Sequence, residues 1–158
     1  MNTSWRPDWP TVVAGFGSPH GDDQAGWRVA AILSRRPDLP ARVMAVHEPT
    51  QVLEALRGCP RLIVVDACQS GGLPGAVTRL VWPDPRIAIA HRYSTHGVGV
   101  ADVLKLAEKL GDLPPHIEVF GIEIRDRSLG QDLTPEVVRA VNEVAVEIVG
   151  RLREVAHA

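Results

Sequence analysis

The stretch Leu62-Ile63-Val64-Val65-Asp66 decides how the rest of the sequence is interpreted. Four consecutive apolar residues, three of them β-branched, indicate a strand that is buried on both faces, as in the middle of a parallel sheet. The run ends at a carboxylate, so we expect the strand to stop at Asp66. Such a strand needs helices on both faces of its sheet, and the flanking sequence should supply them.

Segments of strand and helix character alternate on both sides of this run. Apolar or alternating stretches predict further strands at 11–16, 42–47, 76–82 and 117–122, of which 76–82 suits an antiparallel edge. Helical periodicity and capping signals predict helices at 23–36, 51–57, 98–110 and from Thr134-Pro135-Glu136 onward. The expected fold class is α/β, a three-layer α/β/α sandwich around a mostly parallel, partly mixed sheet of about five strands.

The length and the net charge limit the number of domains and the classes of partner that this sequence can have. The 158 residues suit a single domain over 1–158, with 1–10 as a loose N-terminal extension. The formal net charge of −2 argues against nucleic acid or an anionic membrane as the main partner. We expect a cytoplasmic protein, since the N-terminus lacks the pattern of a secretory signal and no apolar run would span a membrane. Cys59 and Cys68 fit no metal motif or disulfide framework.

Polar residues follow three of the predicted strands. In open α/β sheets, ligands bind at the carboxyl ends of the strands, and this rule selects Asp22-Asp23, Asp66 and Ser94-Thr95-His96. Each has a simpler interpretation as well. One of the paired aspartates can be a helix N-cap, Asp66 can accept turn amides, and His96 can be an ordinary loop histidine.

Together, two carboxylates and one imidazole suit a borderline divalent metal such as nickel, zinc or iron. The cation would offset the repulsion between the clustered carboxylates.

Other kinds of chemistry have less support. The loop from Gly15 to Gly21 lacks the G-x-G-x-x-G spacing, and its two following aspartates would repel a pyrophosphate. No G-x-S-x-G elbow is present for a hydrolase serine. Cys68 lies close to Asp66, but a small buried apolar residue is its simpler interpretation.

At these residues the sequence resembles the hydrogenase maturation proteases, which trim the large subunit of [NiFe] hydrogenases. Five segments carry the resemblance in the same order along the chain. They are Gly15-x-Gly17, Asp22-Asp23-x-x-Gly26, the apolar strand with Asp66-Ala67, Ser94-x-His96-x-x-Gly99, and Phe120-Gly121-Ile122-Glu123 followed by Leu133-Thr134-Pro135.

The resemblance implies an endopeptidase of metal-dependent aspartic type. It removes a C-terminal extension from the large-subunit precursor after nickel insertion. The family's metal ligands then fall on Asp23, Asp66 and His96, which would also be the catalytic residues. Nickel would be supplied by the precursor, and no organic cofactor is expected.

The second strand departs from the family pattern. It leads into His47-Glu48-Pro49-Thr50, where the family usually has Asp-Gly-Gly-Thr. We expect His47 and Thr50 to bind substrate and to help choose which precursor is processed. A locally hydrogen-bonded strand end is the alternative for His47.

Two other functions stay open at this stage. One is a non-catalytic assembly factor that reads the nickel state of a partner, and the other is a stand-alone metal-dependent amidohydrolase. The expected partner is the precursor of a [NiFe]-hydrogenase large subunit. We expect this chain to act on it as a monomer.

Overall fold

A mixed five-stranded sheet forms the centre of the computed structural model, which describes residues 10–90, 98–125, 130 and 132–156. Its strand order is β2-β1-β3-β5-β4, with every neighbouring pair parallel except the antiparallel β4 at one edge. The strands are β1 (Thr11–Phe16), β2 (Ala41–Val46), β3 (Arg61–Cys68), β4 (Val77–Val81) and β5 (His116–Glu123). The predicted α/β class and the antiparallel edge strand are confirmed.

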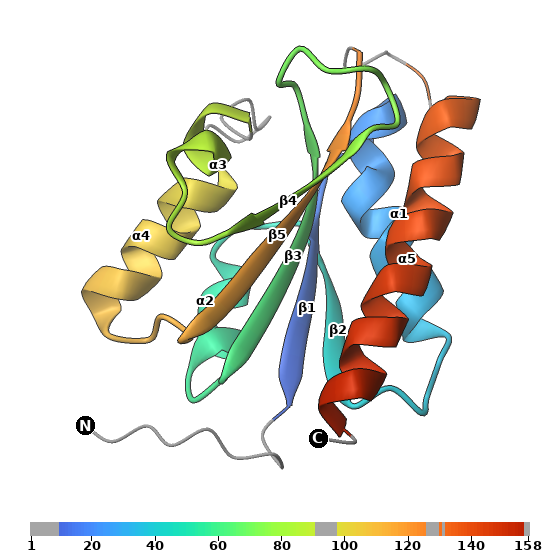
Figure 1. The fold of residues 1–158 in the computed structure, drawn as a ribbon. Coiled ribbons are helices and arrows are strands. Elements are labelled where there is room, and N and C mark those ends of the chain that lie inside the picture. The colour runs from blue at the N-terminus through green and yellow to red at the C-terminus, as the bar shows by residue number, and fades with distance from the viewer. Residues whose placement is uncertain (1–9, 91–97, 126–129, 131, 157–158) are drawn as a thin grey trace.

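Helices cover both faces of this sheet, which makes three layers (Figure 1). On one face lie α1 (Ala25–Ser34) and α5 (Pro135–Ala156), and a 3₁₀ turn, η1 (Gly21–Gln24), precedes α1. The other face carries α2 (Gln51–Leu56), α3 (Pro85–Ala90) and α4 (Val100–Leu110). Among the described residues, no helix is long and apolar enough to cross a membrane.

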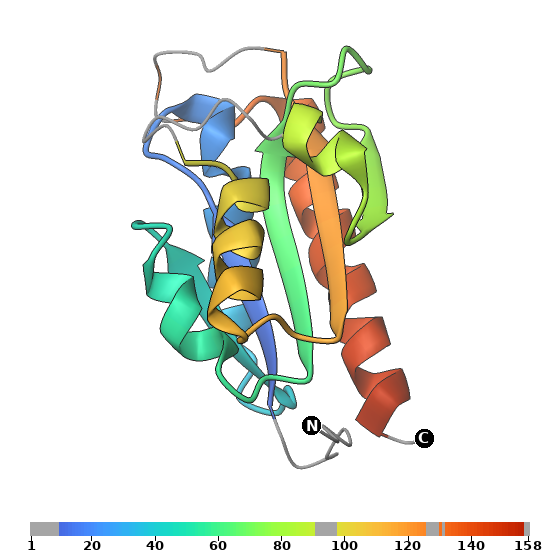
Figure 2. The ribbon, with the colours of Figure 1, turned by 90° about the vertical axis from the view of Figure 1, so that its left-hand side faces the viewer.

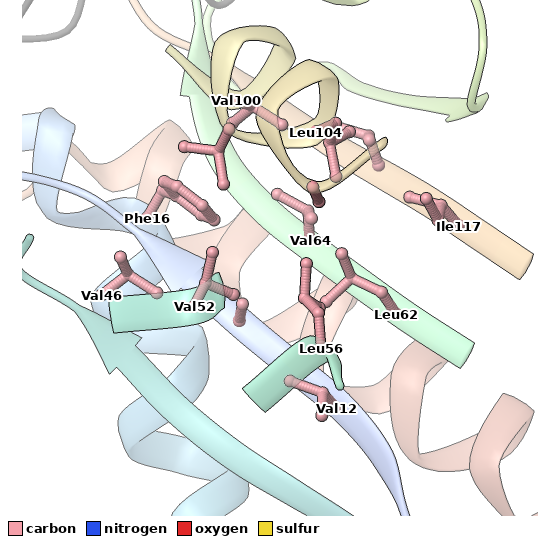
Figure 3. Packing of buried hydrophobic residues seen from close by; sticks show 14 of the residues in the cluster. Val12, Phe16, Val46, Val52, Leu56, Leu62, Val64, Val100, Leu104 and Ile117 are labelled. Carbon is pink, nitrogen blue, oxygen red and sulfur yellow. The ribbon is translucent and has the colours of Figure 1, made fainter. Parts of the chain in front are cut away.

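The two faces of the sheet build two separate hydrophobic clusters. Successive side chains of a strand point to opposite faces, so Leu62 and Val64 of β3 pack with α2 and α4, as Figure 3 shows. Ile63 and Val65 pack instead with α1 and α5. The continuous apolar run of β3 therefore reflects burial on both sides, as its sequence predicted.

Two glycines set how closely α1 approaches the sheet. A Cβ on Gly26 would lie 2.1 Å from the carbonyl oxygen of Phe16 and 2.5 Å from that of Val65. A Cβ on Gly15 would lie 2.1 Å from the carbonyl oxygen of Gly26. Only glycine fits at such contacts, so the first turn of α1 rests directly on the ends of β1 and β3.

The strand β3 does not stop at Asp66, so that expectation was wrong. The strand runs on to Cys68 because β5 continues beside it, with Asp66 opposite Gly121 and Cys68 opposite Glu123. The pairing of β3 with β1 extends only as far as Gly15 and Val65. Asp66 thus lies just past the part of β3 that pairs with β1, within the part that still pairs with β5, rather than at the end of the strand.

The sequence analysis also missed the short helix α3. Its start carries a recognisable signal, because the Asp84 carboxylate accepts the backbone N–H of Arg86 at 2.9 Å, with Pro85 as the first helical residue. Six residues are too few for a helical period to show. The predicted N-terminal extension, 1–10, falls outside the described residues apart from Pro10.

Candidate active site

The carboxyl ends of β1, β3 and β5 lie at one edge of the sheet, together with the start of α1 (Figures 1 and 2). Asp23 belongs to η1, which follows β1 and lies against β3. Gly26, three residues further on, touches the carbonyl of Val65, the neighbour of Asp66. The fold therefore brings Asp23 and Asp66 to the same edge, although 43 positions separate them in the numbering of the chain.

Asp23 is buried and held in place by Ser18. The Asp23 side chain is 9% exposed and Ser18 is 1% exposed. The Ser18 hydroxyl donates a hydrogen bond to Oδ2 of Asp23, and the Ser18 N–H donates to the Asp23 carbonyl at 3.2 Å. A carboxylate held in this way keeps a fixed orientation, which suits a ligand or catalytic group.

Asp66 is half-buried and belongs to the face of β3 that also carries Leu62 and Val64. The same face is covered by α4, which begins at Val100. His96, the third predicted ligand, lies outside the described residues. Within the part of the chain that the structure describes, no group of three potential ligand side chains gathers. The metal site formed by Asp23, Asp66 and His96 therefore stays a prediction.

Asp22 has a structural role that differs from that of its neighbour Asp23, because it binds the residue before α5. Its Oδ1 accepts the backbone N–H of Thr134 at 2.7 Å, and its Oδ2 accepts the Thr134 hydroxyl at 2.9 Å. Thr134 immediately precedes α5, so the carboxylate also faces the positive end of that helix. The expectation that one of the paired aspartates caps the helix that follows them was wrong, because the N-cap of α1 is Gln24 and Asp22 instead accepts hydrogen bonds from the residue before α5.

Replacing Asp22 with alanine should lower the free energy of unfolding by about 2–3 kcal/mol, because two partly buried donors of Thr134 lose their acceptor. Asp22→Asn keeps an acceptor for the Thr134 N–H and should cost less than half as much. Chemical denaturation of the three proteins measures the difference. Equal unfolding free energies for wild type and Asp22→Ala would contradict this role.

Glu123 is a buried carboxylate that the residue-by-residue sequence analysis did not select. It is 2% exposed, at the end of β5. Its oxygens accept the backbone N–H groups of Ser70, Gly71 and Gly72 at 2.9, 3.0 and 3.1 Å. The Ser70 hydroxyl donates at 2.7 Å as well. Glu123 therefore fixes the turn that follows β3, at the edge that carries Asp66.

The hydrogen bonds around Glu123 decide its protonation. Burial by itself would raise its pKa, but hydrogen bonds from Ser70, Cys68 and the backbone of Gly71 outweigh burial and hold the pKa below the ordinary value of 4.5. The Cys68 thiol donates to Glu123 Oε2 at 3.3 Å. Burial, and then this carboxylate, raise the pKa of Cys68 far above that of a free thiol. A neutral, buried thiol is a poor nucleophile, as the sequence analysis expected.

Glu123→Gln should lower the unfolding free energy at pH 7 by about 2–3 kcal/mol, because a charged acceptor of several hydrogen bonds is lost. The folded pKa of Glu123 is depressed, so its contribution is present above pH 4.5 and is lost as the pH falls through the folded pKa. Denaturation curves from pH 7 downward should therefore converge for the two proteins. Glu154→Gln on the exposed side of α5 is the matched control, and parallel curves for Glu123→Gln would contradict this role.

His47 and Thr50 are both exposed and follow β2, whose end lies beside that of β1. Both are therefore placed at the edge that carries Asp23. The ring of His47 lies against the indole of Trp27, with 4.4 Å between the ring centroids. Binding of substrate by His47 and Thr50 stays a prediction.

The fold and the site define a general class of protein, the open α/β domains that carry polar side chains at the carboxyl ends of their parallel strands. Comparison with known sequences defines the family. The sequence model described as HycI, hydrogenase maturation protease, matches residues 28–151. The chain belongs to the hydrogenase maturation protease family.

Individual proteins that are similar to this chain in sequence or structure support the family assignment. The hydrogenase expression/formation protein HupD of Thiocapsa roseopersicina is 29% identical over 160 residues, which cover 96% of this chain and 72% of HupD. HupD of Bradyrhizobium diazoefficiens is 34% identical over 133 residues, 80% of this chain and 69% of that protein. The solved structure of the hydrogenase maturating endopeptidase HybD from Escherichia coli superposes with a TM-score of 0.77 at 25% identity, covering 92% of this chain and 93% of HybD.

Proposed function

We propose that this protein is the endopeptidase that removes the C-terminal extension of a [NiFe]-hydrogenase large-subunit precursor after nickel insertion. The observation that supports the proposal most strongly is the convergence of Asp23 and Asp66 at the carboxyl edge of the sheet, in a member of the maturation protease family. The matched relatives named as maturation endopeptidases support the protease class.

The proposed role of the two aspartates is to contact nickel carried by the precursor, with His96 as the third ligand. Carboxylate oxygens and imidazole nitrogen are ligands that nickel accepts. The substrate brings the metal, and this cation would offset the repulsion between two carboxylates that approach one ion together. Recognition and relief of this repulsion thus occur in one step.

Cleavage then requires water to add to the carbonyl carbon of the scissile peptide. The carbon–nitrogen bond breaks, and the products are a new C-terminal carboxylate and an amine on the released extension. The metal supplies Lewis-acid polarisation of a carbonyl or of water. Asp23, fixed by Ser18, keeps the precursor aligned while the bond is broken. We propose that this takes place in the cytoplasm, on a monomer of the chain.

Intact-mass measurement of a nickel-loaded precursor incubated with the purified protein tests the proposal. A fall in precursor mass by the mass of its C-terminal extension is the expected result. Binding with an unchanged mass would favour the non-catalytic assembly factor instead. Turnover of short amides by a purified protein that retains its own metal would favour the amidohydrolase.

A further inference from the structure

Trp27 connects two segments of the candidate site that lie far apart in the sequence. Its indole Nε1–H donates to the carbonyl oxygen of Val46, the last residue of β2, at 2.9 Å. Its ring lies against that of the next residue, His47, at 4.4 Å between centroids and 48° between planes. One half-buried side chain therefore fixes both the backbone end of β2 and the imidazole that follows it.

Trp27 also contacts Gly17, in the segment between β1 and η1. A Cβ on Gly17 would lie 3.1 Å from Cδ1 of Trp27 and 2.8 Å from the carbonyl oxygen of Asp23. The β1–α1 loop thus packs closely on the indole and on the backbone of Asp23. Trp27 is itself anchored, because it belongs to α1 one residue after Gly26, which is pressed against the sheet.

The exposure of His47 indicates what this arrangement is for. His47 is an exposed residue although its ring contacts that of Trp27, so a partner can reach it from solvent. A tilted aromatic contact and an anchored backbone restrict the imidazole to few orientations, and so reduce the entropy lost when it binds. Imidazole binds a hydrogen-bonding partner, such as a carboxylate or a backbone group of the precursor.

We propose that Trp27 is a positioning residue for substrate selection, which holds His47 toward the precursor at a fixed place relative to Asp23. The proposal rests on the proposed function. It assigns to Trp27 a contribution to recognition of the precursor and none to the bond-breaking step.

Steady-state processing of the nickel-loaded precursor tests this role through the separation of KM and kcat. Trp27→Leu removes the indole contact and should raise KM about three- to tenfold, the size expected for losing one aromatic pair, with kcat within about twofold of wild type. Trp27→Phe keeps an aromatic ring and should recover part of the loss. Trp82→Leu is the matched control. Trp82 packs near the edge of the sheet that lies across from β2, so its substitution should leave KM unchanged.

A double variant separates positioning from a merely structural role. His47→Ala should raise KM as much as Trp27→Leu does, and the double variant should be no worse than His47→Ala alone. A full additional effect of Trp27→Leu in the His47→Ala protein, or an unchanged KM in Trp27→Leu, would overturn the proposal.

The contact can also be measured without substrate. The NMR resonance of the His47 Hε1 proton should carry a ring-current shift that disappears in Trp27→Leu and persists in Trp82→Leu. The absence of this shift in wild type would refute the positioning role whatever the enzyme cleaves. Failure of the wild type to process any precursor, with the shift present, would refute the proposed function instead.

Discussion

Replacing Asp66 with asparagine should slow processing of the nickel-loaded precursor by about 10²- to 10³-fold, the usual cost of removing one electrostatic group from an active site. Asparagine has nearly the same shape but lacks the charge that a nickel ion would need from this position. The half-buried location of Asp66 in β3 makes a large loss of stability unexpected. The measurement is the rate of appearance of the shortened precursor, followed by intact mass.

Asp23→Asn should cause a loss of the same order, and the double variant should be little worse than either single one. Groups that act on one ion are not additive, because removal of one already disables the unit. Asp38→Asn is the matched control, since Asp38 is exposed and pairs with Arg153 at 3.3 Å, away from the site. Near-normal processing by Asp66→Asn would remove Asp66 from the active site.

Gly26→Ala should lower the free energy of unfolding by about 3 kcal/mol or more, a large part of the ~5–15 kcal/mol that stabilises an ordinary domain. The added methyl group would meet two backbone carbonyl oxygens, at 2.1 and 2.5 Å, and neither strand can move without losing its sheet partners. Any relaxation has to lift the start of α1 and with it Asp23. Processing should therefore fall together with stability, and chemical denaturation measures the second.

Gly150→Ala is the natural comparison. This glycine lies in the exposed part of α5 and has nothing within 4 Å of an added Cβ. Alanine has the higher helix propensity, so this variant should gain about 1 kcal/mol. If Gly26→Ala unfolds at the same denaturant concentration as wild type, α1 does not rest on the strand ends as described above.

The sheet could be predicted from the sequence because its central strand is buried on both faces. The run Leu62–Val65 is apolar on both faces and therefore fits only the middle of the sheet. The alternation at 76–82 indicated the edge strand correctly. The short helix α3 escaped detection because its start signal, Asp84-Pro85, was not followed by a helical period.

The position of Asp66 was estimated from the apolar run alone. Whether a strand continues past a polar residue depends on the neighbour that pairs with it, here β5, and a single strand's sequence does not show this. The same rule of polar residues at strand ends could have selected Glu123, which directly follows the apolar segment of β5.

Contacts between distant segments were beyond the sequence analysis for a different reason. Asp22 and Thr134 lie 112 positions apart, and Trp27 reaches Val46 from another element. Each of these polar side chains has several possible partners of suitable chemistry along the chain. Only the packing of α1 and α5 against the sheet selects one of them, so such pairs follow from the fold and not from spacing.

The most direct test of nickel recognition compares two forms of one precursor, loaded with nickel and free of it, at equal concentration with the wild-type protein. If Asp23 and Asp66 engage the metal that the precursor carries, the nickel-loaded form should be shortened and the nickel-free form should be processed at least about 10²-fold more slowly. Equal rates of shortening for the two forms would contradict nickel recognition by this edge of the sheet.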